Sequence, residues 1–268
     1  MTTGTLKAND GAPSMKTNDE LVVALPEPGL SMSQDAEWCV VQIDGEWRQY
    51  RFHDYEALYS VPGLYEKIIY EILQCDSPRV VRELLEAELS KSDDSGEELR
   101  VLDFGAGNGM VGEELANLGV RHIVGVDIIP EAAEAAGRDR PGLYERYHVV
   151  DLTDLSDRQM QDLRSHNFTA MTCVAALGFG DIPTEAFATA FNLVRTGGWV
   201  AFNIKEDFLS KEDESGFSRL IRAMLEDGTL EIRQRKRYQH RLATDQQALY
   251  YVAIIGTKKK DISSRLLK

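Results

Sequence analysis

From Leu99 onward, short apolar runs alternate with amphipathic runs along the chain. We predict strands at "RVLDF", "HIVGVD", "YHVVD", "FTAMTCVA" and "GWVAFNI", and helices at "MVGEELANL", "PEAAEAAG", "SDRQMQDLRS" and "TEAFATAFNLV". Alternating strands and helices indicate a parallel sheet with helices on both faces, because a right-handed crossover is the compact way to join parallel strands. The pattern therefore predicts an α/β fold in three layers.

The two ends of the chain depart from this alternation. Near the C-terminus we predict two long strands, "GTLEIRQRKRYQHRL" and "ALYYVAIIGTKK", which are joined only by "ATDQQ" and must therefore be antiparallel neighbours. Near the N-terminus, apolar and polar residues alternate in "EWCVVQIDGEWRQYRF" on both sides of Asp44-Gly45. This dipeptide is typical of two-residue turns, so we predict a β-hairpin. Helices are expected at "GLYEKIIYEIL" and at "SPRVVRELLEAELS", where Ser77 is the expected N-cap.

These elements predict a Rossmann-like sheet of about seven strands with an antiparallel terminal hairpin, plus an N-terminal hairpin and helical cap. We expect a flexible tail over residues 1–20, because this segment is polar and rich in Thr, Asn, Gly and Asp. The hairpin and cap would occupy residues 21–98, which end in the polar run "SKSDDSGEE". The α/β domain would occupy residues 99–268.

Composition and charge narrow the class of protein. With 268 residues, 43% of them hydrophobic and 28% charged, the chain is typical of a soluble globular protein. The formal net charge of -14 repels phosphate backbones and anionic lipids, so we expect neither nucleic acid nor a membrane as partner. The basic run "RQRKRYQHR", from Arg233 to Arg241, is the local exception, and we interpret it as a solvated strand face.

Cysteine usage and hydropathy indicate a cytoplasmic location. Cys39, Cys75 and Cys173 are odd in number and lack C-x-x-C spacing, which favours a reducing compartment and argues against a metal site. Cys173 lies in an apolar run and is expected to be inert core. The N-terminal segment lacks an apolar signal region, and no run approaches the roughly 18 apolar residues of a membrane span.

The stretch "VLDFGAGNGMVGEEL" permits two interpretations. The pattern G-x-G-x-x-G fits it at Gly107, Gly109 and Gly112, which would indicate a dinucleotide pyrophosphate. That register forces Asp103 and Gly105 into the strand. A turn at Gly105 instead leaves Asp103 near the carboxyl end of the strand, where a carboxylate opposes a pyrophosphate and suits a ligand that carries an ammonium group.

"VLDFGAGNG" resembles motif I of the class I S-adenosylmethionine-dependent methyltransferases, and "VGVDII", "VVDLTDL", "CVAALGFGD" and "VRTGGWVAF" follow in the order of that family. The resemblance implies that S-adenosyl-L-methionine is the cofactor. In the family, the acid after the second strand holds the ribose and the acid after the third meets the adenine. The cofactor-binding residues implied here are Asp103, Gly105, Ala106, Gly107, Asn108, Asp127, Ile128, Asp151, Leu152, Val174 and Ala175.

Within the family, the chain is most similar to small-molecule methyltransferases and to the methyltransferase-like protein of the Williams-Beuren region. "FHDYEALYSVPGLYEKI" resembles the N-terminal segment that folds over the cofactor in these relatives, which makes Tyr55 and Tyr59 candidate contacts. Residues 99–268 would then form the S-adenosylmethionine-binding methyltransferase domain.

Methyl transfer is an in-line displacement at an activated carbon, so the protein mainly aligns the nucleophile and excludes water. A general base helps only where the acceptor must lose a proton. The candidate catalytic residues are His53, Tyr59, Asp181 and Glu206. We expect transfer to an oxygen, nitrogen or sulfur atom of a small-molecule metabolite, by a monomer or homodimer.

Other functions remain open at this level. A protein methyltransferase could use the Asp44-Gly45 hairpin and the long last strands as a peptide-binding edge. A non-catalytic S-adenosylmethionine-binding regulatory module would keep Asp103, Asp127 and Asp151 and would lack an open acceptor pocket. A nicotinamide oxidoreductase is the remaining alternative.

Overall fold

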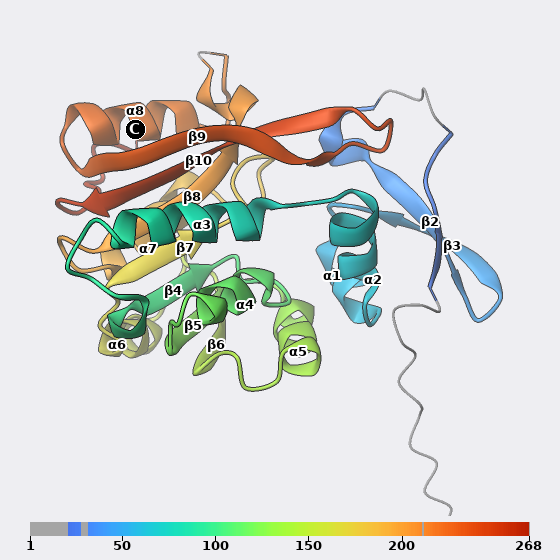
Figure 1. Ribbon diagram of the computed structural model, residues 1–268, viewed down its shortest axis with the longest axis horizontal. Helices are drawn as coiled ribbons and strands as arrows, with labels where there is room; N and C mark the ends of the chain where they lie inside the picture. Colours follow the sequence, from blue (N-terminus) through green and yellow to red (C-terminus); the bar gives the residue numbers. More distant parts are fainter. Residues whose placement is uncertain (1–20, 28–31, 211, 268) are drawn as a thin grey trace, which may run out of the picture.

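The computed structural model describes residues 21–27, 32–210 and 212–267. Its centre is a seven-stranded sheet in the order β6-β5-β4-β7-β8-β10-β9, with helices on both faces (Figure 1). The strands are β4 (Arg100–Phe104), β5 (His122–Asp127), β6 (Arg146–Val149), β7 (Ala170–Cys173), β8 (Trp199–Lys205), β9 (Leu230–Leu242) and β10 (Ala248–Lys258). Neighbours from β6 to β8 are parallel, and β10 is antiparallel to β8 and β9. The predicted fold is confirmed.

Helices cover the two faces of this sheet with separate apolar layers. Side chains of α3 (Ser77–Leu89) and α4 (Met110–Asn117) pack on one face. Side chains of α6 (Asp157–Ser165), α7 (Thr184–Leu193) and α8 (Phe217–Glu226) pack on the other face. Helix α5 (Pro130–Asp139) follows β5 and contacts the N-terminal unit. The amphipathic spacing of each helix thus gives one of the two outer layers.

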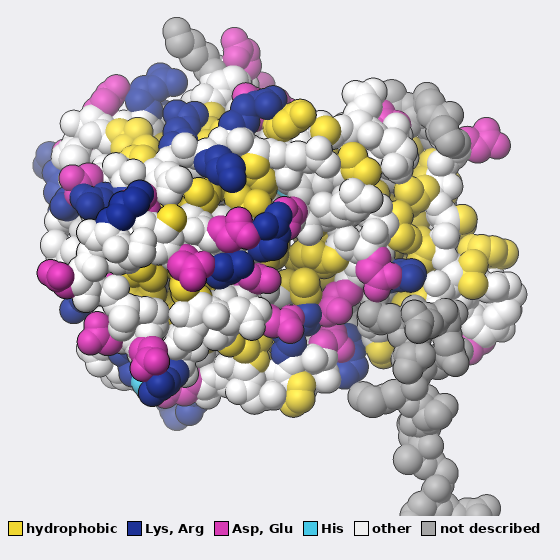
Figure 2. Space-filling view, viewed as in Figure 1, with side chains coloured by type: hydrophobic (Ala, Val, Ile, Leu, Met, Phe, Trp, Pro, Cys, Tyr) yellow, Lys and Arg dark blue, Asp and Glu magenta, His cyan; other side chains and the backbone are white. Residues whose placement is uncertain are grey.

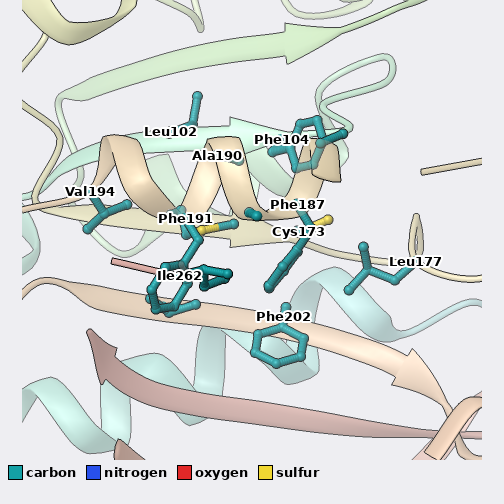
Figure 3. Packing of buried hydrophobic residues seen from close by; sticks show 14 of the residues in the cluster. Leu102, Phe104, Cys173, Leu177, Phe187, Ala190, Phe191, Val194, Phe202 and Ile262 are labelled. Carbon is teal, nitrogen blue, oxygen red and sulfur yellow. The ribbon is translucent and has the colours of Figure 1, made fainter. Parts of the chain in front are cut away.

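The layer around α7 shows how sequence spacing produces packing. Phe187 and Phe191 lie four residues apart on α7, so they share one face of the helix. They lie beside the sheet together with Phe202 of β8 (Figure 3), and the ring centroids of Phe187 and Phe202 are 5.3 Å apart. All three side chains are fully buried, and burial of each contributes roughly 1.5–3 kcal/mol.

Strand order locates the expected binding crevice. The chain passes from β4 to β5 on one side, while β7 lies on the other side of β4. In sheets of this kind, ligands bind beyond the carboxyl ends of the strands at such a reversal. The loops after β4, β5 and β7 are therefore the ones to inspect for a site.

An N-terminal unit lies beside these loops. It contains a three-stranded antiparallel sheet of β1 (Val22–Ala24), β2 (Trp38–Ile43) and β3 (Glu46–Arg51), seen at the right of Figure 1 next to α1 and α2. The remaining elements are the 3-10 helix η2 (Gln34–Ala36), α1 (Tyr55–Ser60), α2 (Leu64–Glu66) and the π-helical η3 (Lys67–Ile72). Tyr59 of α1 packs on Ala132 and Ala135 of α5, which fixes this unit against the main sheet.

Several local predictions can be compared with this structure. The hairpin turn is confirmed, since Asp44 and Gly45 both have positive φ, 54° and 84°, as a two-residue turn of this type requires. Strand β1 and helix α8 were not predicted. The predicted N-cap at Ser77 is wrong, because Asp76 occupies the N-cap position and Ser77 is the first helical residue. The predicted tail, residues 1–20, lies outside the described residues.

The surface and the basic run bear on the expected partners. Acidic and basic side chains are interspersed over the face seen in Figure 2. On β9, Arg233, Arg235, Lys236 and Arg237 are exposed, as expected of a solvated strand face. His240 and Arg241 are buried, so the interpretation is wrong for the end of the run. Within the described ranges, no helix is long and apolar enough to cross a membrane.

Candidate functional site

A cleft of three adjoining compartments lies at the ends of β4, β5 and β7. The strand-β6 compartment is lined by Phe104, Gly105, Asp127, Ile128, Val150, Asp151, Leu152, Asp181, Ile182, Pro183 and Ala186. The glycine-loop compartment is lined by Tyr55, Tyr59, Tyr65, Gly105, Asp127, Ile128, Ile129, Val174, Ala175, Ala176, Asp181 and Ile182. The aromatic compartment is lined by Gln34, Phe52, His53, Tyr55, Tyr65, Ile69, Ala175, Ala176, Leu177, Phe179, Asp181, His240, Arg241 and Tyr251.

The three compartments adjoin one another and share lining residues. Gly105 and Asp127 belong to both the strand-β6 and glycine-loop compartments. Tyr55 and Ala175 belong to both the glycine-loop and aromatic compartments, and Asp181 lines all three. The glycine-loop compartment encloses about 530 Å³ of space between side chains, its open mouth included.

The glycine loop leaves β4 at Gly105 and is packed tightly between its neighbours. Gly105 has a φ of 70°, and a Cβ there would lie 2.9 Å from the Cβ of Ala176. Gly107 has a φ of 53°, and a Cβ there would lie 2.5 Å from the Tyr59 hydroxyl oxygen. Positive φ and the missing space both require glycine, so the turn falls at Gly105, as the second interpretation of the sequence predicts.

Asp127 lies at the end of β5 with its carboxylate beside this loop. The amide of Gly107 donates to Oδ2 at 2.9 Å, and the amide of Ile129 donates to Oδ1 at 3.1 Å. Burial raises the pKa of Asp127, and the backbone hydrogen bonds act against that rise. Each carboxylate oxygen has a further lone pair, so Asp127 can still accept hydrogen bonds from a ligand in the two compartments that it lines.

Asp103 lies beneath the loop and does not line any of the three compartments. It is fully buried, and the hydroxyls of Tyr144 and Thr172 each donate to its carboxylate at 2.8 Å. Burial raises the pKa of Asp103 to about 6. The predicted contact with a ligand ammonium group is therefore not supported by this geometry, since both oxygens are directed at protein hydroxyls.

Two other loop residues also lie beneath the surface of the cleft. Ala106 is buried, and Asn108 is buried with its side-chain amide donating to Glu66 Oε1 at 2.9 Å. Neither residue lines the three compartments. Gly105 is thus the loop residue that borders the cleft, while Ala106, Gly107 and Asn108 support it from below.

The strand-β6 compartment brings Asp151 and Leu152 close to Asp127 and Ile128. Asp151 Oδ1 accepts from the amide and the hydroxyl of Thr153, both at 2.7 Å. These hydrogen bonds lower the pKa of Asp151. Asp151 is therefore a charged acceptor at one end of the cleft.

His53 and Asp181 meet in the aromatic compartment although they lie 128 residues apart in the sequence. His53 Nδ1 lies 3.2 Å from Asp181 Oδ2, and the Phe179 ring packs on His53 with centroids 5.1 Å apart. The side chain of His53 is 14% exposed and that of Asp181 is 33% exposed. The pair is thus partly shielded from water and still open to the compartment.

The other two catalytic candidates are placed differently. Tyr59 lines the glycine-loop compartment beside Gly107, and burial raises its pKa well above the usual value. Glu206 lies on the 3-10 helix η5 (Glu206–Leu209), where it pairs with Arg237 at 2.9 Å. Glu206 lines none of the three compartments, so the structure does not bring it to the cleft.

A buried hydrogen-bond network supports the loop after β7. Ala175 has a φ of 58°, unusual for a residue other than glycine, and its amide donates to Asn203 Oδ1 at 2.6 Å. The Asn203 amide group donates in turn to Ser77 Oγ at 3.0 Å and to the Tyr238 hydroxyl at 2.6 Å. Ser77 Oγ also lies 2.6 Å from His240 Nδ1, so the network reaches the aromatic compartment.

Sequence reasoning missed most of the aromatic compartment. Gln34, His240, Arg241 and Tyr251 line it and were not predicted, whereas Phe52, Tyr65 and Phe179 lie within the segments "FHDYEALYSVPGLYEKI" and "CVAALGFGD" but were not singled out as site residues. His240 and Arg241 belong to the basic run that we interpreted as a solvated strand face. Arg241 forms a buried ion pair with Glu37 at 2.5 Å, a partner 204 residues away in sequence. Gln34 carried no local signal.

Comparison with known families gives the class of protein. A family model for the methyltransferase domain matches residues 73–246, more than half of the chain. The chain therefore belongs to this methyltransferase-domain family. The match includes α3, which also packs on the main sheet.

Curated relatives match a shorter segment. The ubiquinone biosynthesis O-methyltransferase of Aromatoleum aromaticum is 33% identical over 104 residues, which cover 39% of this chain and 43% of that protein. The protein of the same name from Thiobacillus denitrificans is 32% identical over 104 residues, with the same coverage of 39% and 43%. The matched segment thus spans less than half the length of these relatives.

A solved structure shares the fold. The N-methyltransferase NodS from Bradyrhizobium japonicum, in complex with S-adenosyl-L-homocysteine, superposes with a TM-score of 0.51 at 15% sequence identity. The superposition covers 77% of this chain and 97% of that chain. At this identity the likeness is one of fold.

Proposed function

We propose that this protein is an S-adenosyl-L-methionine-dependent methyltransferase that acts on a hydroxyl oxygen of a small molecule. The observation that carries the proposal is the adjacency of the compartments lined by Asp127 and Asp151 to the compartment that holds the His53–Asp181 pair. Membership of the methyltransferase-domain family supports the activity. The name of the curated relatives supports oxygen as the methyl acceptor.

We assign the cofactor to the glycine-loop and strand-β6 compartments. Asp127 would accept from the ribose hydroxyls, with Ile128 against the ring system, and Asp151 would accept from the adenine amino group beside Leu152. Gly105, Val174 and Ala175 would border the methionyl part, where the lack of a Cβ at Gly105 lets the backbone approach closely. When bound, the cofactor supplies a methyl carbon activated by its sulfonium.

We assign the acceptor to the aromatic compartment, where the His53–Asp181 pair serves as general base. The hydrogen bond between Asp181 and Nδ1 of His53 favours the tautomer in which Nε2 carries the lone pair. Nε2 can then take the proton from an acceptor hydroxyl as its oxygen bonds to the methyl carbon. The products are a methyl ether, a neutral thioether and a protonated His53, which releases its proton to solvent.

The N-terminal unit would exclude water from this reaction. Tyr55, Tyr59 and Tyr65 form a cluster of rings over the glycine-loop compartment, with Tyr59 and Tyr65 centroids 4.8 Å apart. The guanidinium of Arg138, on α5, donates to the Tyr59 carbonyl oxygen at 3.2 Å. An aromatic cover of this kind favours alignment of the reactants and a low local dielectric constant.

Asp127→Ala tests the assignment of the cofactor. The variant loses the proposed acceptor for two ribose hydroxyls, so we expect the dissociation constant for S-adenosyl-L-homocysteine to rise by about 10- to 100-fold. Titration calorimetry measures this change. Asp154→Ala, a nearby exposed aspartate, is the matched control. Unchanged affinity in Asp127→Ala, or binding of NAD alone by the wild type, would contradict the proposal.

His53→Gln tests the general base. The variant keeps a polar side chain but cannot take the proton, so methyl transfer should slow by about 100-fold or more, while affinity for S-adenosyl-L-homocysteine stays unchanged. The assay follows methyl-labelled cofactor into the small-molecule fraction of a cell extract. His122→Gln, an exposed histidine, is the control. A wild-type rate in His53→Gln would remove its role, and label found only in protein would favour the protein methyltransferase alternative.

Other expectations remain predictions beside this proposal. They are the likeness to the Williams-Beuren protein, the boundaries at residues 20 and 98, the cytoplasmic location, the lack of a nucleic-acid partner, and a monomeric or homodimeric state.

A further inference from the structure

Gln34, a residue that lines the aromatic compartment, carries a side-chain oxygen without a hydrogen-bond partner among the described residues. Gln34, on η2, is only 8% exposed, and its Oε1 is buried without a hydrogen bond to any described residue. Its Nε2 donates to the Tyr251 hydroxyl at 3.0 Å, which fixes the side chain in place. A buried amide oxygen without a donor destabilises the folded protein. Gln34 lines the aromatic compartment, so a molecule bound there could supply the missing donor.

The other buried side-chain atoms that lack partners lie elsewhere. Among the described residues, these are Glu131 Oε2 and Gln234 Oε1. Neither residue lines the compartments of the cleft. Among these three residues, Gln34 is thus the one that lines the cleft.

The remaining walls limit the chemistry of the occupant. Phe52, Tyr55, Tyr65 and Phe179 are aromatic residues of its lining, a composition that suits a flat apolar ligand. His240 is stacked on Tyr251 with centroids 3.9 Å apart, and burial lowers the pKa of His240 well below its usual value, so it is neutral at pH 7.

The guanidinium of Arg241 in this wall is already paired. Arg241 and Glu37 form a buried ion pair, and the amide of Thr244 donates to the second oxygen of Glu37 at 2.6 Å. An anionic substituent on the acceptor would therefore compete with Glu37 for Arg241 and would lie near the oxygen of Gln34. Both effects disfavour a carboxylate or a phosphate.

We propose that Gln34 selects the methyl acceptor, which is an uncharged aromatic compound with two polar substituents. One is the hydroxyl that is methylated next to His53. The other is a hydroxyl or amino group that donates a hydrogen bond to Gln34 Oε1. This inference rests on the proposed function, because it takes the aromatic compartment as the acceptor site.

The test compares simple phenols as binding probes for the wild-type protein saturated with S-adenosyl-L-homocysteine. The probes are phenol, the three benzenediols catechol, resorcinol and hydroquinone, and the monomethyl ether of each diol. The diols offer a second donor, the ethers offer only an acceptor there, and phenol offers neither. We expect at least one diol to bind about tenfold tighter than both phenol and its own ether, because a buried acceptor discriminates strongly against ligands that leave it unpaired.

Variants assign this preference to Gln34. Gln34→Met keeps the length of the side chain but cannot accept, so the preference should fall below about threefold. Gln34→Glu keeps an accepting oxygen and should retain the preference. Gln49→Met, an exposed glutamine of the same N-terminal unit, is the matched control and should behave as wild type. All variants should bind S-adenosyl-L-homocysteine with unchanged affinity.

Several results would overturn the inference. These are equal binding of phenol and every diol, equal binding of a preferred diol and its ether, a preference that persists in Gln34→Met, or binding of no probe at all. The wild-type comparison does not depend on the folding of any variant. Failure of the proposed function would be seen separately, as a lack of S-adenosyl-L-homocysteine binding by the wild type.

Discussion

Asp103 and Asp127 lie near the carboxyl ends of adjacent strands, but they differ in their access to the cleft. Asp103 ends its strand inside the protein, where Tyr144 and Thr172 satisfy its carboxylate. Asp127 ends its strand at the cleft and takes its hydrogen bonds from backbone amides. Burial raises the pKa of both groups. Only Asp127 has the location to contact a ligand, although both acids stand at motif positions in the sequence.

Asp103→Asn should reveal the buried charge through the pH dependence of stability. Burial raises the pKa of Asp103 from 3.8 in the unfolded chain to about 6 in the folded protein. Between these values the folded state holds a proton that the unfolded state has lost, so wild-type stability falls as pH rises from about 4 to 6. The variant lacks this group. The difference between the free energies of unfolding, variant minus wild type, should therefore increase by roughly 2–3 kcal/mol from the lower to the upper end of this window.

Urea denaturation at pH 4 and pH 7 measures the effect. Other carboxyl groups titrate in both proteins and cancel in the difference. Asp154→Asn, at an exposed site, serves as control and should show no such trend. A stability difference between Asp103→Asn and wild type that is the same at both pH values would contradict the prediction.

At the scale of elements, the loop after β7 depends on partners from three other segments. Asn203 of β8 holds the amide of Ala175, and its own amide group is held by Ser77 at the start of α3 and Tyr238 of β9. The network lies between the sheet and the cleft, so the position of Ala175 is determined by packing behind it. This explains why Ser77, predicted as an N-cap, has its hydroxyl directed to Tyr238 and His240.

Asn203→Leu should separate this positioning role from plain stability. Loss of the acceptor frees Ala175 from its left-handed conformation, so the variant should lose about 1–3 kcal/mol of unfolding free energy and bind S-adenosyl-L-homocysteine several-fold more weakly. Asn203→Asp keeps the acceptor for the Ala175 amide and should keep that affinity. Calorimetry well below the melting temperature measures both. Wild-type affinity in Asn203→Leu would show that the network serves stability alone.

The elements themselves were largely predictable from the sequence. The parallel strands and the helices between them follow from local periodicity, which is why "HIVGVD" became β5 with its predicted bounds. Helix α8 has a strongly amphipathic sequence and could have been found by the same criterion. Strand β1 has only three residues, too few for a period to be recognised. The helix predicted over "GLYEKIIYEIL" is mostly π-helical, a difference that apolar spacing does not encode.

At the scale of the whole molecule, the N-terminal unit completes the cleft. Glu37 of this unit pairs with Arg241 of β9 in a fully buried contact. Glu66 of α2 accepts from Arg140 at 2.7 Å, which ties the cap to the end of α5. Both contacts join segments far apart in the chain, so the compartments exist only when the unit and the main domain are assembled.

The sequence by itself determined the layered sheet, the turn at Gly105 and the placement of Asp127 and Asp151 at successive strand ends. It could do so because periodicity, turn chemistry and motif order are local properties. Only the tertiary structure decided that Asp103 is buried and that His53 meets Asp181, 128 residues away. It also brought Gln34 to Tyr251 across 217 residues. Contacts between distant segments depend on the packing of complete layers, which no local pattern records.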